Sequence, residues 1–174
     1  MNGILTQLKR VTLDLDDAQV GWALVGALAA SVYCEPRTTR DIDVAVSLSA
    51  SGDFSGLESH LIRRGYARGP LLMHLAPARK MGFRLAIPSP GGTGLPLDIL
   101  FSSSGIEREI VDGAQRLEVL PGVLIPVACL SHMIAMKVLS QNDGDRIRDK
   151  ADLRQLILRA SDEDISGARE FSDL

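Results

Sequence analysis

The sequence predicts a domain of the α/β (α+β) class. Its mixed sheet is flanked by helices, and a helical hairpin lies at the C-terminus. Two observations lead to this fold class. Short apolar runs with strand character fill the middle of the chain, while segments with helical periodicity precede and follow them. Turns rich in Gly and Pro separate the two kinds of segment, an arrangement typical of a sheet domain with a helical appendage.

The length and composition limit the number of domains. A chain of 174 residues, 45% of them hydrophobic, can bury one core but is short for two ordinary domains. We therefore expect one domain with a core over residues 1–125 and a helical hairpin over 126–162 packed on that core. A flexible tail is expected over 163–174, where the sequence is polar and acidic.

The first part of the chain alternates between helical and extended segments. The small apolar residues after Gly26 suit a buried helix, which Pro36 ends. The loop RTTR leads into the run DIDVAVSL, which reads as a strand. The elements expected here are a helix over 2–17, a strand over 22–25, a helix over 27–34, a strand over 41–48 and a helix over 56–64.

The second part contains two strands joined by a turn, and helices follow them. The stretch PSPGGTG, rich in Pro and Gly, predicts a hairpin-like turn, and LPLDILFS after it alternates as a strand does. The elements expected here are strands over 83–87 and 95–102, a helix over 106–114, an extended segment over 119–127 and helices over 128–140 and 148–160.

The cysteines and the N-terminus indicate the compartment. Cys34 and Cys129 each lie in an apolar run, which favours buried free thiols over a disulfide or a zinc site. The N-terminus does not resemble a signal peptide, and no apolar run reaches the roughly 18 residues that a membrane span requires. We expect a soluble cytoplasmic protein, whose formal net charge of -3 argues against indiscriminate nucleic-acid binding.

Asp41 and Asp43 open the strand DIDVAVSL. Because side chains two residues apart on a strand point to the same face, the two carboxylates lie together, about 6.5–7 Å apart along the strand. Both carboxylates can coordinate one Mg²⁺ ion. This ion takes oxygen ligands, often one or two carboxylates together with substrate phosphates. An isolated pair of this kind is more often a solvated strand end or a loop cap.

Asp98 is the only charge in the apolar strand LPLDILF. A buried carboxylate is costly without a partner, so Asp98 lies at a sheet surface or is neutralised by a cation. A neighbouring strand bearing Asp41 and Asp43 would supply that cation as metal. Three carboxylates on adjacent strands can hold two ions about 3.5–4 Å apart for in-line phosphoryl or nucleotidyl transfer, with Asp98 also accepting a proton from the attacking hydroxyl.

Two further positions have open interpretations. Gly26, at a strand-to-helix junction, lets backbone N–H groups approach a phosphate, or serves only close helix packing. Lys137 interrupts the apolar face of MIAMKVL and needs an anion, which Asp149 or Asp152 could supply from one face of the next helix. That cluster is either part of an active site or an ion pair that ties two helices together.

Two sets of motifs resemble a known superfamily. The run LVGALAASVYCEPRTTRDIDVAV resembles the first motif of the DNA polymerase β-like nucleotidyltransferases, and LPLDIL resembles their third carboxylate strand. The run IPVACLSHMIAMKVLSQNDGDRIRDKADLRQLI is similar to the C-terminal signature of the AbiEii-like abortive-infection toxins. Together these segments cover about half of the chain, in the order found in the family.

The resemblance implies a nucleotidyltransferase-like sheet and assigns roles to individual residues. It implies that the three Asp residues bind metal, that they act in catalysis together with a lysine, and that a second group binds the nucleotide. The implied metal ligands are Asp41, Asp43 and Asp98, the implied catalytic residues are the same three with Lys137, and the implied nucleotide-binding residues are Gly26, Ala27, Lys137, Asp149 and Asp152.

The chain departs from the family at Ala27. The family commonly has Gly-Ser or Gly-Gly where this chain has Gly26 and Ala27, and the serine hydroxyl helps to hold the triphosphate. Arg37 and Arg40 flank the Asp pair and are candidates to compensate by binding phosphate, although exposed loop arginines are more often simply solvated.

Two functions of different class follow. In the favoured one, the protein is a Mg²⁺- or Mn²⁺-dependent enzyme that moves a nucleoside monophosphate from an NTP to a hydroxyl on RNA such as tRNA, on a protein or on a small molecule. The resemblance further implies a toxin with a cognate antitoxin. In the other, the protein is a catalytically weak or inactive module that binds a nucleotide or a partner, which Ala27 favours.

Overall fold

The computed structural model describes residues 2–47, 54–73, 80–89, 92–101, 105–139 and 147–172. Its helices are α1 (Asn2–Asp17), α2 (Gly26–Tyr33), α3 (Phe54–Arg63), α4 (Glu107–Asp112), α5 (Leu130–Leu139), α6 (Ile147–Arg159) and α7 (Asp162–Ser172). Its strands are β1 (Gly21–Val25), β2 (Ile42–Ser47), β3 (Ala67–Met73), β4 (Lys80–Ser89), β5 (Gly92–Leu100), β6 (Gln115–Leu120) and β7 (Val123–Val127). Within these ranges, no helix has both the length and the apolar character needed to cross a bilayer.

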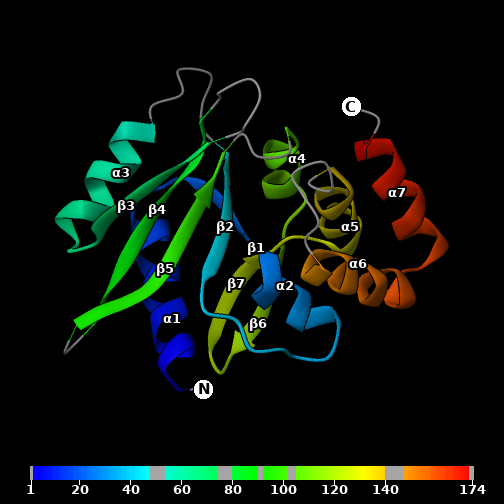
Figure 1. The fold of residues 1–174 in the computed structure, drawn as a ribbon, viewed down its shortest axis with the longest axis horizontal. Helices are drawn as coiled ribbons and strands as arrows, with labels where there is room; N and C mark the ends of the chain where they lie inside the picture. The colour runs from blue at the N-terminus through cyan, green and yellow to red at the C-terminus, as the bar shows by residue number, and fades with distance from the viewer. Residues whose placement is uncertain are drawn as a thin grey trace.

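The described strands form one mixed sheet of order β3-β4-β5-β2-β1-β7-β6. Strand β2 pairs in parallel with β5, and β1 pairs in parallel with β7. The pairs β1–β2, β3–β4, β4–β5 and β6–β7 are antiparallel. In Figure 1, α1 lies behind the sheet and α2 lies in front of it. The predicted mixed sheet flanked by helices is therefore confirmed.

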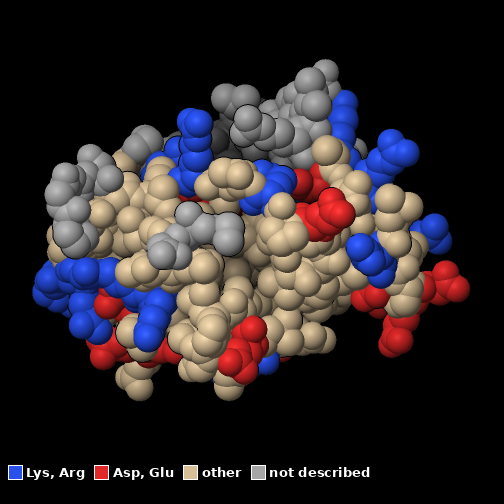
Figure 2. Space-filling view, turned by 90° about the horizontal axis from the view of Figure 1, so that it is seen from below, with Lys and Arg blue, Asp and Glu red and all other residues tan. Residues whose placement is uncertain are grey.

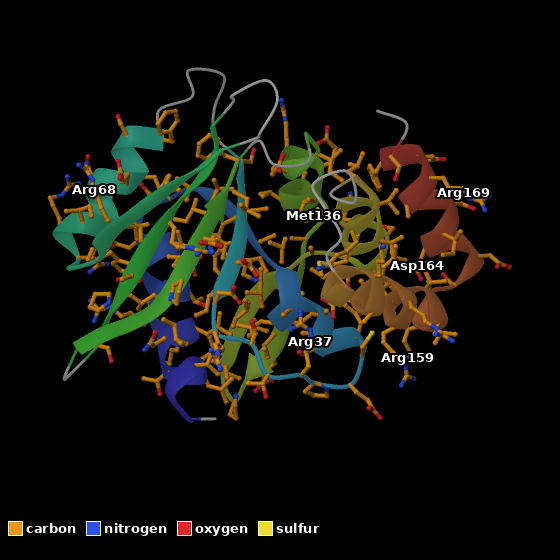
Figure 3. All side chains as sticks on the ribbon, viewed as in Figure 1. Arg37, Arg68, Met136, Arg159, Asp164 and Arg169 are labelled. Atoms are coloured by element: carbon orange, nitrogen blue, oxygen red, sulfur yellow. The ribbon has the colours of Figure 1, made fainter. Side chains whose placement is uncertain are left out.

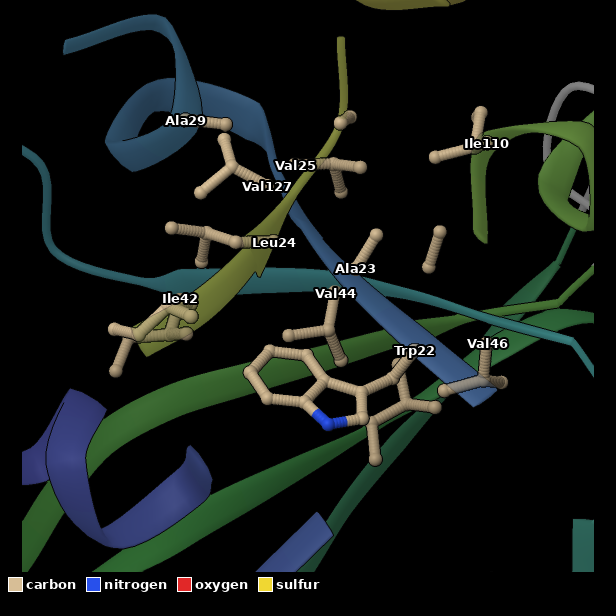
Figure 4. Packing of buried hydrophobic residues seen from close by; sticks show 14 of the residues in the cluster. Trp22, Ala23, Leu24, Val25, Ala29, Ile42, Val44, Val46, Ile110 and Val127 are labelled. Carbon is tan, nitrogen blue, oxygen red and sulfur yellow. The ribbon is translucent and has the colours of Figure 1, made fainter. Parts of the chain in front are cut away.

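The core surrounds the central strands β1 and β2 (Figure 4). Ile42, Val44 and Val46 of β2 are all buried. Trp22 of β1 packs beside them, and its Nε1 atom donates a hydrogen bond of 2.9 Å to Asp16 at the end of α1. Each buried apolar side chain stabilises the fold by about 1.5–3 kcal/mol. This packing fixes the position of β2, which directly follows Asp41.

Strand β3 was not predicted from the sequence. Its run ARGPLLM contains a glycine and a proline, which weaken the pattern of a strand. Its pairing with β4 is irregular, with a register shift between Arg68 and Leu71. Among the described strands, β3 lies at the edge of the sheet and pairs only with β4, and an edge strand tolerates proline.

Two hairpins lie in the second part of the chain, and one of them was expected. Strands β4 and β5 pair as far as Ser89 opposite Gly92, so the hairpin predicted around PSPGGTG is confirmed, with its tip at 90–91 outside the described residues. The segment 119–127 was predicted as one extended stretch. It is instead the end of β6, a turn at 121–122 and β7, because Gly122, at φ +72°, supports a tight turn.

The C-terminal residues form a helix where a flexible tail was expected. Helix α7 packs against α5, so the expected hairpin of α5 and α6 gains a third helix. The apolar residues Ile165, Ala168 and Phe171 recur at helical spacing and pack against the core. Ser161 caps α7, because its Oγ accepts from the N–H of Asp164 at 3.1 Å while Asp164 Oδ2 accepts from the N–H of Ser161 at 2.9 Å. That reciprocal cap is the sequence signal that was overlooked.

Candidate active site

Three carboxylates come together where strands β2 and β5 lie side by side. Asp41 directly precedes β2, and Asp43 lies within it. Because β2 pairs in parallel with β5, Asp43 lies opposite Asp98. Each of the three residues offers one oxygen, and these oxygens all lie within 4.8 Å of one another. The structure therefore brings together the three Asp residues that the sequence singles out.

The three carboxylates repel one another. Burial and, after it, the charges of Asp41 and Asp98 raise the pKa of Asp43, and Lys137 and Arg84 partly oppose them, so that the pKa is about 7. Carboxylate oxygens are the ligands that hard cations such as Mg²⁺ prefer. The cluster thus has the ligand type, the spacing and the excess negative charge that fit a divalent cation.

Arg84 of β4 is a site residue that sequence reasoning missed. It lies opposite Asp98 in the β4–β5 ladder, and its Nε and Nη2 atoms donate hydrogen bonds of 2.6 Å to Oδ1 and Oδ2 of Asp98. From the sequence, Asp98 lies at a sheet surface or is neutralised by a cation, and the structure places the Arg84 guanidinium beside it. A signal was available, because Arg84 is the only charge in the apolar run FRLAI, and the same argument singled out Asp98.

The loop before β2 orients the first carboxylate. Thr39 donates a hydrogen bond of 2.5 Å from Oγ1 to Oδ1 of Asp41. This hydroxyl was also missed, because a threonine in a polar loop has no distinctive pattern. Arg40, which was predicted to contact phosphate, lies between these two residues and is exposed.

Gly26 starts α2 at the end of β1 and lies against the carboxylates. Its φ of +66° is the left-handed conformation that favours glycine. A Cβ atom on Gly26 would overlap the carboxylate of Asp43, since Val25 pairs with Asp43 in the β1–β2 ladder. Asp43 itself therefore requires the absence of a side chain at Gly26. The next residue, Ala27, is buried.

Lys137, Asp152 and Arg37 form a second charged cluster. Lys137 Nζ lies 3.3 Å from Oδ2 of Asp152, so the ion pair considered from the sequence is present. Arg37 donates two hydrogen bonds of 2.8 Å to the same carboxylate, and in Figure 3 it lies beside α2, near α6. Arg37, predicted as a phosphate contact, thus pairs with Asp152. Asp149 lies in α6, but its side chain is outside the described residues.

Lys137 connects the two clusters. Its charge lowers the pKa of Asp43, and it also pairs with Asp152. Burial raises the pKa of Asp152, but Arg37 and Lys137 outweigh burial and hold that pKa below its usual value. Asp152 is therefore an ionised carboxylate that holds Lys137 close to the three-carboxylate cluster.

The fold is that of nucleotidyltransferases. The chain is similar to the antibiotic-resistance factor ANT(2'')-Ia, with a TM-score of 0.64 and 15% identity over 97% of this chain and 90% of that chain. It is also similar to an antigenic nucleotidyltransferase-like protein from Paracoccidioides brasiliensis, with a TM-score of 0.61 and 18% identity over 99% of this chain and 88% of that chain. The lincosamide antibiotic adenylyltransferase LnuA has a TM-score of 0.52 and 17% identity over 89% of this chain and 97% of that chain.

The sequence shows the family within that fold. Residues 8–172 match the family described as nucleotidyl transferase AbiEii toxin, of a type IV toxin–antitoxin system. The chain belongs to this family, as the motifs implied, and it is a nucleotidyltransferase. No curated protein sequence matches it.

Proposed function

We propose that this enzyme moves a nucleoside monophosphate from an NTP to a hydroxyl acceptor in a reaction that needs Mg²⁺ or Mn²⁺ and releases pyrophosphate. The observation that supports this most is the convergence of Asp41, Asp43 and Asp98, with oxygens within 4.8 Å of one another. These three residues would hold the metal. When bound, a divalent metal neutralises charge on the triphosphate and on the attacking oxygen.

The start of α2 and Lys137 would bind the phosphates. The N–H groups in the first turn of a helix have no partner within the helix and attract anions, and Gly26 and Ala27 supply such groups beside Asp43. Because Ala27 has no hydroxyl, the triphosphate would depend more on Lys137. That side chain is only 14% exposed, and Asp152 holds its ammonium in place.

Asp98 would receive the proton of the acceptor. The acceptor oxygen attacks the α-phosphorus, the bond from that phosphorus to the bridging oxygen of pyrophosphate breaks, and the hydroxyl proton passes to a carboxylate oxygen. In the structure both oxygens of Asp98 accept hydrogen bonds from Arg84. Arg84 therefore competes with the acceptor hydroxyl for the oxygens of Asp98.

The acceptor is a hydroxyl on RNA such as tRNA, on a protein or on a small molecule. Figure 2 shows basic side chains gathered at the end of the molecule formed by α3, with acidic ones among them. The ion pairs agree with this, since Arg64 contacts Asp14 and Arg68 contacts Glu58. The basic side chains at this end are therefore partly neutralised, and this patch is not a purely basic surface for a nucleic acid.

The family description supports a toxin of a toxin–antitoxin pair, and we propose a cognate antitoxin as the partner of this chain. A binding module with weak or absent catalysis is the second candidate. The missing hydroxyl at Ala27 and the hydrogen bonds that occupy Asp98 favour this candidate. The three converging carboxylates favour the enzyme.

Labelling experiments test the proposal. The protein is incubated with each radiolabelled NTP, with Mg²⁺ or Mn²⁺, and with total RNA, cell protein or small-molecule extract as acceptor. We expect label on one acceptor class with the wild type and none with Asp43→Asn or in EDTA. Transfer that persists in EDTA would overturn the metal dependence. Normal binding of metal–NTP without any transfer would favour the binding module.

A further inference from the structure

The contact between Arg84 and Asp98 is the shortest pair of side-chain hydrogen bonds in the candidate site. Both bonds measure 2.6 Å, and both oxygens of the carboxylate are used. Such bidentate contacts between a guanidinium and a carboxylate are among the strongest in proteins. The side chain of Asp98 is 10% exposed and that of Arg84 is 37% exposed. Asp98 is therefore enclosed, and Arg84 is the partner with room to move.

This contact conflicts with the metal site proposed above. A divalent ion held by Asp41, Asp43 and Asp98 would take an oxygen that lies within hydrogen-bonding distance of the Arg84 guanidinium. Two cations on one carboxylate repel each other, and the repulsion is strong where water is largely excluded. A bound metal would therefore weaken the two hydrogen bonds that Arg84 donates to Asp98.

The surroundings limit where Arg84 can go. The carboxylates whose charges act on it are Asp98, Asp41 and Asp43, which are the three proposed metal ligands. Lys137 differs, because its partner Asp152 lies outside that group, so Lys137 can stay in place when metal binds. Once metal has taken these three carboxylates, the NTP triphosphate that arrives with the metal is an anion onto which Arg84 can move.

We propose that Arg84 is a positioning residue that occupies Asp98 in place of the metal and moves onto the phosphates of the NTP when metal and nucleotide bind together. This inference rests on the proposed function. It assigns Arg84 two opposite effects, because the guanidinium competes with the metal when nucleotide is absent and supports nucleotide binding when both are present. A purely structural arginine would have neither effect.

Arg84→Gln separates these effects, with Arg84→Lys as the conservative variant. Arg68→Gln is the matched control, because Arg68 pairs with Leu85 in the neighbouring ladder and so projects from the opposite face of the sheet to Arg84. It contacts Glu58 at 3.0 Å and is labelled in Figure 3. Calorimetry of full-length protein measures Mn²⁺ binding alone and then binding of NTP at saturating Mn²⁺. Circular dichroism in EDTA checks the fold.

We expect Arg84→Gln to bind Mn²⁺ alone about tenfold more tightly and the NTP at saturating Mn²⁺ about tenfold more weakly than the wild type. Arg84→Lys should recover part of the NTP affinity, and Arg68→Gln should match the wild type in both titrations. Parallel losses in both titrations of a folded Arg84→Gln, or no change in either, would overturn the proposal. If Arg84→Gln does not fold, Arg84→Lys decides, because loss of the paired geometry should still tighten Mn²⁺ binding.

The outcome for the wild type separates this proposal from the proposed function. Wild-type protein whose Mn²⁺ binding is absent, or is unaffected by Asp43→Asn, would overturn the metal site and Arg84's role with it. Wild-type protein that binds Mn²⁺ and NTP through Asp43, with an Arg84→Gln variant that behaves like the wild type, would overturn the role of Arg84 alone.

Discussion

A side chain on Gly26 would overlap the carboxylate of Asp43, so the start of α2 and strand β2 fit together only with glycine there. We expect Gly26→Ala to weaken Mn²⁺ binding at least about tenfold, because Asp43 has to move away. From the sequence alone, a substitution at Gly26 is expected to weaken mainly NTP binding. The contact with Asp43 predicts that it also weakens metal binding. Calorimetric titration with Mn²⁺, followed by NTP, measures both effects.

Gly122→Ala is the control for this prediction. Gly122 has a φ of +72°, close to the +66° of Gly26, and a Cβ atom on it would have nothing within 4 Å. Both variants should lose about 1 kcal/mol of stability from the left-handed backbone, and Gly26→Ala should lose more because of the overlap. Equal Mn²⁺ affinities in the two variants would contradict the contact argument.

Removal of the charge of Asp43 should stabilise the protein in EDTA. The raised pKa of Asp43, about 7, lies above the roughly 3.9 of an unfolded chain. Between these values the folded protein keeps a proton that the unfolded chain loses, so the stability contributed by this group falls as the pH rises. Asp43→Asn should exceed the wild type by about 1 kcal/mol at pH 8 and by less at pH 5. Urea unfolding at both pH values measures this, and a less stable variant at pH 8 would count against repulsion.

Asp152 should matter more for stability than Lys137. Asp152 is 8% exposed and pairs with both Arg37 and Lys137, so Asp152→Asn leaves two cations without their shared carboxylate. Lys137→Met leaves Asp152 paired with Arg37. We expect losses in free energy of unfolding of about 2–4 kcal/mol for Asp152→Asn and about 1 kcal/mol for Lys137→Met.

Lys137→Met should nevertheless abolish NTP-dependent labelling, because the ammonium would contact the phosphates. Thermal unfolding and the labelling assay on the same preparation compare the two effects. If Lys137→Met instead costs several kcal/mol and still binds metal–NTP normally, Lys137 serves only to tie α5 to α6.

The two thiols should react at different pH. Cys34 and Cys129 are both free, as the sequence predicts, but they are half-buried where buried thiols were expected. Burial raises the pKa of Cys34. Burial has the same effect on Cys129, but hydrogen bonds with His132 Nδ1 at 2.9 Å and Ser131 Oγ at 3.1 Å outweigh it and lower the pKa of Cys129 to about 7. Alkylation of the single-thiol variants measures this difference. In Cys34→Ser, which keeps Cys129, the alkylation rate should rise with a midpoint near pH 7, while Cys129→Ser, which keeps Cys34, should react slowly at that pH. A midpoint near 9 for Cys129 would show that these hydrogen bonds do not act on the thiol.

The sequence by itself determined the local features of the site. Alternation along DIDVAVSL placed Asp41 and Asp43 on one side of a strand, and an isolated charge in an apolar run singled out Asp98. The helix that starts at Gly26 also followed from local pattern. These features were predictable because backbone geometry within a few residues sets the direction of each side chain.

Only the tertiary structure decided which of these groups meet. It set Asp43 opposite Asp98, placed Arg84 across from Asp98 in the ladder, and joined Arg37 to Asp152 over a separation of 115 residues. Strand order and register depend on how whole apolar faces pack against one another, and no pattern within a single segment contains that information. For the same reason only the tertiary structure showed that α7 packs against α5, where its apolar side chains are stabilised by the rest of the protein.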